Sequence, residues 1–109
     1  MSLDIEFTRS RNIVCPKCGD IIETLVVESS ASGGRVWYEF LESLGYYVPY
    51  DQRTEENDWY GKDMILTEEQ VKEAIRFVRT HEISREGSIL KLLVDAIMFN
   101  HTVVVNADW

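Results

Sequence analysis

The sequence lacks a second pair of closely spaced cysteines. Its only cysteines, Cys15 and Cys18, form a single C-x-x-C motif in a chain of 109 residues. Structural zinc sites usually hold the metal with four protein ligands, so one such motif supplies half of a site. No apolar run approaches the roughly 18 residues that a membrane span requires, and no basic stretch followed by an apolar one marks an export signal. We therefore expect a protein of a reducing compartment that does not interact with membranes.

Motifs typical of common enzyme classes are also missing. The chain has no P-loop, no G-x-G-x-x-G, no H-E-x-x-H and no G-x-S-x-G sequence, and it has only two histidines. A metal-dependent nuclease would need several converging carboxylates beside a surface that attracts phosphate. The acidic composition argues against such a surface, so we expect that the protein is not an enzyme.

Basic residues are scarce, with 11 Lys and Arg against 19 Asp and Glu, which gives a formal net charge of −8. Residues 51–73 alone carry eight acids and three bases. Such a segment repels phosphate, so direct binding to nucleic acid is not expected, and a basic protein partner is. The alternative is that the acids form a solvated face and the aromatic rings among them close the core. The predicted partner-binding residues are Glu55, Glu56, Asp58, Trp59, Tyr60, Glu68 and Glu69.

The hydrophobic pattern predicts one α+β domain over residues 1–109. An N-terminal β-hairpin, with strands at residues 5–14 and 21–27, carries the cysteine turn at its tip. Residues 28–34 are rich in serine and glycine and predict a loop. A short apolar strand at residues 102–105 is expected to join the hairpin in the sheet.

Three helices are expected between these strands. The first begins near Arg35 and ends at Gly45, and an irregular aromatic segment follows over residues 46–66. Thr67 begins a capping box for the second helix, which ends near His81. Ser84 is expected to cap the third, strongly apolar helix.

The segment Cys15-Pro16-Lys17-Cys18-Gly19 resembles the metal-binding knuckle of zinc ribbons and rubredoxins, which predicts bound zinc. Those families use two knuckles, so further ligands are needed here. The candidates are His101 at the beginning of the last strand, Asp108 just after its end, and His81, which also suits a helix C-terminus. A site shared between two chains, each giving Cys15 and Cys18, is another solution, and an empty turn is a third.

A redox role for the two cysteines is a further alternative. In thioredoxin-like proteins the C-x-x-C motif opens a helix, which lowers the thiol pKa. Here a strand is expected after Asp20, so the helix is missing where redox chemistry requires it.

Taken whole, the chain resembles small acidic proteins carried by bacteriophages and prophages of Gram-positive bacteria. The resemblance lies in G-G-R-V-W-Y at residues 33–38, Y-Y-V-P-Y at 46–50, N-D-W-Y-G-K-D at 57–63 and N-A-D-W at 106–109. It implies an anti-CRISPR inhibitor, a DNA mimic that blocks target DNA loading by a type II RNA-guided endonuclease in the bacterial host cytoplasm. The protein would be a monomer or a zinc-linked homodimer. The alternative is a zinc-ribbon-like adaptor in another bacterial or phage complex.

Overall fold

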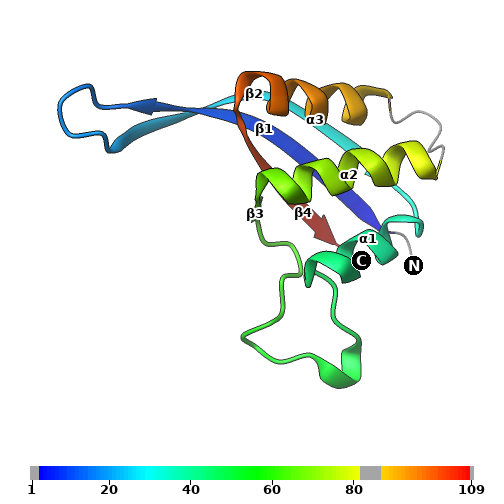
Figure 1. Cartoon of the computed structure of the whole chain (residues 1–109). Helices are drawn as coiled ribbons and strands as arrows, with labels where there is room; N and C mark the ends of the chain where they lie inside the picture. Colours follow the sequence, from blue (N-terminus) through cyan, green and yellow to red (C-terminus); the bar gives the residue numbers. More distant parts are fainter. Residues whose placement is uncertain (1–2, 82–86, 109) are drawn as a thin grey trace.

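The protein folds into one antiparallel sheet with helices packed on one of its faces (Figure 1). The structure is a computed structural model that describes residues 3–81 and 87–108. Within these residues four strands follow the order β2-β1-β4-β3 across the sheet, and three α-helices are present. In chain order the elements are β1 (Asp4–Val14), β2 (Ile21–Gly33), α1 (Trp37–Leu44), the 3₁₀ helix η1 (Tyr50–Gln52), β3 (Met64–Leu66), α2 (Glu68–Thr80), α3 (Gly87–Phe99) and β4 (Thr102–Asp108).

The two central strands, β1 and β4, begin and end the chain. Their antiparallel register pairs Asp4 with Asp108 and Ser10 with Thr102. Alternate side chains of both strands point toward the helices and are buried, because successive residues of a strand face opposite sides of the sheet. The α+β fold with an N-terminal hairpin and a C-terminal strand in the sheet is confirmed. The buried apolar residues on this face are Ile5, Phe7, Val103, Val105 and Ala107, together with Leu3 directly before β1.

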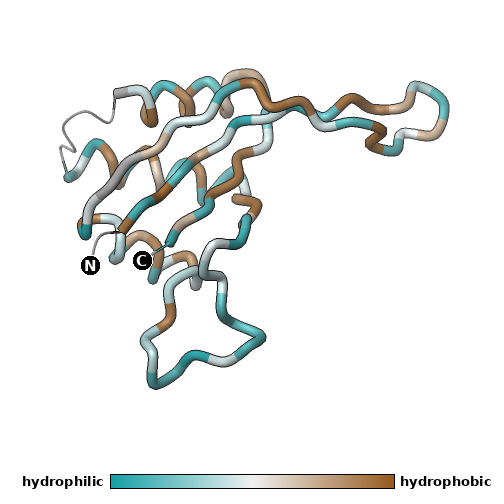
Figure 2. The backbone as a smooth tube through the Cα atoms, turned by 180° about the vertical axis from the view of Figure 1, so that it is seen from behind, coloured by the Kyte–Doolittle hydropathy of each residue, from teal (hydrophilic) through white to brown (hydrophobic). Residues whose placement is uncertain are grey.

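The core is built where the helices meet this inner face. The ring of Trp37 lies 5.4 Å from that of Phe7 and 5.2 Å from that of Phe77, between centroids. Ile89, Leu92 and Leu93 of α3 are fully buried in the same core, whereas Met98 and Phe99 at the end of this helix are exposed. Figure 2 shows the sheet from the opposite side, where no described helix covers it. Among the described residues no helix is long and apolar enough to cross a membrane.

The hairpin extends past the rest of the sheet as a two-stranded arm, which we define as residues 11–25 (Figure 1). β4 pairs with β1 only as far as Ser10, so beyond this residue β1 pairs with β2 alone. A register shift between Arg9 and Ser10 leaves Val27 of β2 as an extra residue at the base of the arm. The radius of gyration is 14.7 Å, against about 13 Å for a compact domain of this length, because the arm and a long loop project from the body.

The predicted loop over residues 28–34 is wrong, because β2 continues through Gly33. Thr8 pairs with Ser29 and Glu6 with Ala31, so this serine-rich segment is held as a strand by β1. Hydrogen bonds to β1 satisfy the backbone groups of this segment, and they outweigh the local preference of serine for loops, because strand propensity depends strongly on context. Only Gly34, with φ +136°, lies outside the strand.

The helix ends follow local sequence signals. Gly45 ends α1 in the left-handed conformation, with φ 76°. Thr67 and Gln70 form the predicted capping box, in which each side chain accepts a hydrogen bond from the backbone N–H of the other residue. His81 is the C-cap of α2, as expected. The predicted cap Ser84 lies outside the described residues.

Candidate functional site: a cysteine knuckle and an acidic loop

The cysteines lie in the turn that closes the arm. Val14 pairs with Ile21, and the backbone N–H of Cys15 donates to the carbonyl of Asp20 at 2.8 Å. The N–H of Gly19 donates back to the carbonyl of Cys15 at 2.9 Å, and Gly19 has φ +77°, which favours glycine. Both thiols are free, and Cys18 is exposed. The turn therefore presents two sulfur atoms to solvent at the end of the arm.

Hydrogen bonds to the sulfur of Cys15 lower the pKa of its thiol. The largest contribution comes from the backbone N–H of Cys18, followed by the Cys18 side chain and the backbone N–H of Lys17. A group that accepts hydrogen bonds in its charged form is favoured in that form. Thiolates are the sulfur species that bind metals. The knuckle thus favours the form of Cys15 that a zinc site requires, and it places the two sulfurs next to each other.

The three other predicted zinc ligands lie away from the knuckle. Asp108 pairs with Asp4, which is eleven residues before Cys15, or about 36 Å along an extended strand. His101 directly precedes Thr102, which pairs with Ser10. Ser10 is about 17 Å from Cys15 by the same measure. Within the described part of the chain, no three His, Cys, Asp or Glu side chains form a group that could hold a metal.

The two histidines have other contacts instead. Nη1 of Arg9 donates to Nδ1 of His101 at 3.2 Å. His81 packs on the ring of Phe77, and its Nε2 lies 3.9 Å from a carboxylate oxygen of Glu39. Its position at the end of α2 matches the helix C-terminal role that was the alternative to metal binding.

The second candidate site is the loop between α1 and β3, over residues 46–63, which we call the acidic loop. It projects away from the sheet and the helices (Figure 1). Five acidic and two basic side chains lie in it. Asp51, Glu55 and Glu56 are exposed, and within the described residues they make no ion pair. Tyr50 beside them is 87% exposed.

Tyr46 anchors the base of the acidic loop. This side chain is fully buried, and its hydroxyl accepts from the backbone N–H of Ala107 at 2.8 Å. The hydroxyl donates its one proton between two carbonyl oxygens, that of Lys62 at 2.6 Å and that of Ala107 at 3.1 Å. Its ring stacks on Trp59 with 6.1 Å between centroids. Both ends of the loop are therefore tied to the last strand.

Hydrogen bonds within the loop fix its outer part. Thr54 and Asn57 exchange backbone and side-chain bonds at 2.7 and 3.3 Å. Nη2 of Arg53 donates to the carbonyl of Val48 at 2.8 Å. The loop therefore presents its carboxylates on a defined scaffold rather than on an unstructured linker.

The predicted partner-binding residues fall into different environments. Glu55 and Glu56 are exposed on the acidic loop, whereas Trp59 is half-buried against Tyr46. A carboxylate oxygen of Asp58 accepts from the backbone N–H of Tyr60 at 3.1 Å, so both residues take part in the loop's own structure.

Glu68 and Glu69 lie in the first turn of α2, apart from the loop residues in sequence. Their carboxylates are 3.9 and 3.7 Å from the ammonium group of Lys72. Negative side chains at a helix N-terminus also interact favourably with the helix dipole. These two acids therefore have a local structural role.

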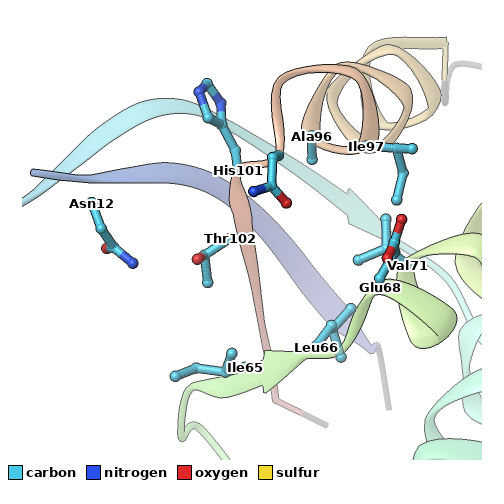
Figure 3. Close-up of a pocket in the computed structure, with 10 residues that line it drawn as sticks. Asn12, Ile65, Leu66, Glu68, Val71, Ala96, Ile97, His101 and Thr102 are labelled. Atoms are coloured by element: carbon cyan, nitrogen blue, oxygen red, sulfur yellow. The ribbon is translucent and has the colours of Figure 1, made fainter. Parts of the chain in front are cut away.

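A pocket of about 310 Å³ lies where α2, α3, β3 and β4 meet (Figure 3). Its walls combine apolar side chains, such as Leu66, Val71 and Ile97, with polar ones, such as Glu68 and Thr102. The imidazole of His101 points away from these side chains, which agrees with its bond to Arg9 (Figure 3). Neither cysteine lines this pocket.

Two features were missed by sequence reasoning. Tyr50 and Asp51 form η1 at the outer part of the acidic loop, and both are exposed. The Pro49-Tyr50-Asp51 sequence has the proline that often begins a turn, which was the available signal. Arg9 is buried in β1 and holds Glu28 at 3.0 Å, and no local pattern indicates this pair.

Comparison of the chain with protein families, with characterised proteins and with solved structures finds no match.

Proposed function

We propose that the protein is a zinc-binding acidic protein that acts by binding a basic protein partner and has no catalytic step of its own. The observation that carries this proposal is the structure of the acidic loop, which internal hydrogen bonds stabilise. Its side chains Asp51, Glu55 and Glu56 are exposed to solvent and form no ion pair with any described residue. Carboxylates in such a setting are free to pair with lysine and arginine of another protein. The net charge of −8 adds long-range attraction toward a basic surface.

An anchored loop is a better docking element than an unstructured one. The buried hydroxyl of Tyr46 and the stack with Trp59 fix its base, so little conformational freedom is lost when a partner binds. Tyr50 is the exposed aromatic beside the acids, and tyrosine is frequent among the residues that contribute most to binding. In this proposal Tyr50 is the apolar anchor, and the carboxylates give orientation and a fast encounter.

The partner we propose is a type II RNA-guided DNA endonuclease, as the resemblance to small phage proteins implies. Such nucleases hold the guide–target duplex in a positively charged channel. A protein that covers this channel would prevent target DNA from loading. The protein would then act as an anti-CRISPR inhibitor in the cytoplasm of a bacterial host, with its carboxylates in place of DNA phosphates.

A pull-down against a purified type II effector at rising salt tests the proposal. We expect binding that weakens with ionic strength, and an affinity about 3- to 30-fold lower for the double variant Glu55→Gln/Glu56→Gln. The control is Glu6→Gln/Glu42→Gln, which removes the same charge from exposed positions on β1 and α1. Equal weakening by both pairs would show that only net charge matters, and no binding at low salt would reject this partner.

One observation favours a second function, the redox role. The lowered pKa of Cys15 would also suit reversible disulfide formation with the adjacent Cys18. A functional redox pair would cycle between dithiol and disulfide in a glutathione buffer and would not retain zinc. Thiol titration over a pH series, with and without zinc, separates the two roles.

A further inference from the structure

The turn at the end of the arm supplies two zinc ligands, and the described part of the chain supplies no third. Tetrahedral zinc in a structural site requires four. We propose that two copies of the chain share one zinc ion at their arm tips, with Cys15 and Cys18 of each copy forming a four-sulfur site. This inference rests on the zinc part of the proposed function and adds the source of the missing ligands.

The shape of the molecule allows two tips to meet. Pairing with β4 stops at Ser10, and the cysteine turn lies five residues further out, or about 17 Å beyond the last β1–β4 pair. Figures 1 and 2 both show the arm clear of the helices and of the acidic loop. Two copies related by a two-fold axis through the metal would therefore bring their sulfurs together while their bodies remain apart. Two-fold dimers are the commonest form of protein oligomer.

The charge distribution does not oppose this contact between two copies. Residues 11–24 carry two bases, Arg11 and Lys17, and two acids, Asp20 and Glu23. The whole net charge of −8 therefore lies outside this segment. Two bodies of like charge repel each other, whereas two tips that are neutral before zinc binds do not.

Apolar side chains surround the cysteine turn. Val14 and Ile21 form the last pair before it, and they are 49% and 59% exposed. Ile22, an extra residue at the register shift beside them, is 66% exposed. A tip-to-tip contact shields these side chains from water. It is nevertheless far smaller than the roughly 1,200 Å² typical of stable interfaces, so association should require the metal.

The experiment is to purify the full chain in reductant without added metal, and to measure zinc content and mass in solution. We expect half a zinc per chain and a doubling of the 12.7 kDa mass, with a return to monomer when a strong chelator removes the zinc. Adding half an equivalent of zinc should restore the dimer. One zinc per monomeric chain, a chain without zinc, or a dimer that survives the chelator would each overturn the proposal.

Variants locate the contact. Cys18→Ser should remain monomeric with zinc, whereas the control Lys17→Ala keeps both thiols in the same turn and should dimerise like the parent. Both positions are exposed and outside the core, so far-UV circular dichroism should show an intact body in each. Cobalt titration gives a second readout, since the visible spectrum of four-sulfur cobalt differs from that of a two-sulfur site. A two-sulfur spectrum for the parent would also overturn the proposal.

Failure here is distinguishable from failure of the proposed function. One zinc per monomer would reject the shared site and leave zinc binding in place. Absence of zinc would reject both the shared site and zinc binding, but it would not affect the partner-binding measurement. That measurement depends on Glu55 and Glu56 of the acidic loop.

Discussion

Replacing Tyr46 by phenylalanine removes one oxygen atom from a fully buried side chain that ties the acidic loop to β4. The hydroxyl accepts from the N–H of Ala107 at 2.8 Å and lies 2.6 Å from the carbonyl of Lys62. The phenyl ring keeps its packing, so the change isolates the hydrogen bonds. The buried N–H of Ala107 then has no partner from the side chain, and an unsatisfied buried group costs about 1–3 kcal/mol.

We therefore expect Tyr46→Phe to lower the free energy of unfolding by about 2 kcal/mol. For a domain of this size that corresponds to a fall in melting temperature of about 8–16 °C. Equilibrium unfolding in urea measures the first quantity, and calorimetry the second. Hydrogen exchange should also show a faster rate at the Ala107 amide.

The matched control is Tyr50→Phe, which removes the same atom from a side chain that is 87% exposed. Its effect on stability should stay within about 0.5 kcal/mol. If Tyr46→Phe were as mild as this control, the reasoning that Tyr46 anchors the loop would be refuted.

Three further predictions concern the body of the protein. Burial is the main cause that raises the pKa of Tyr46, and the nearby carboxylates add to it. The folded pKa therefore lies above the unfolded value of 10. The contribution of Tyr46 to stability is complete below pH 10 and is lost as the pH rises through the folded pKa. Between pH 8 and alkaline pH, the parent should therefore lose more unfolding free energy than Tyr46→Phe does. Arg9→Met should cost about 3–5 kcal/mol in urea unfolding, because it leaves the half-buried carboxylate of Glu28 without its cation, whereas Asp95 keeps Lys91 at 3.7 Å; a change below about 1 kcal/mol would contradict this. Thr67→Ala should cost about 1 kcal/mol through loss of the capping box, whereas Thr67→Ser should be nearly neutral, and equal losses would argue against the cap.

The parts of the fold that were predicted correctly depend on local signals. Alternating residues in β1 and the capping box at Thr67 are readable over a few positions, and both appear as expected. The serine-rich end of β2 was missed because only its pairing with β1 makes it a strand. β3, three residues long, was missed for the same reason, since it exists through its pairing with β4.

The candidate site shows the same division. The cysteine turn was predictable because its two cysteines are three positions apart in sequence. The positions of His101 and Asp108 depend on how β4 is aligned with β1, and one sequence does not reveal this alignment. The anchoring of the acidic loop depends on the contact of Tyr46 with Ala107, which are 61 residues apart. No spacing rule connects such residues.

The extra residue Val27 lies at the point where the sheet narrows to two strands. Bulges of this kind bend a strand and increase its twist. Because the cysteines lie about 17 Å beyond this bend, a rotation of about 20° there would displace them by about 6 Å. A small change in backbone conformation at the base of the arm would therefore be amplified into a much larger displacement of the two thiols.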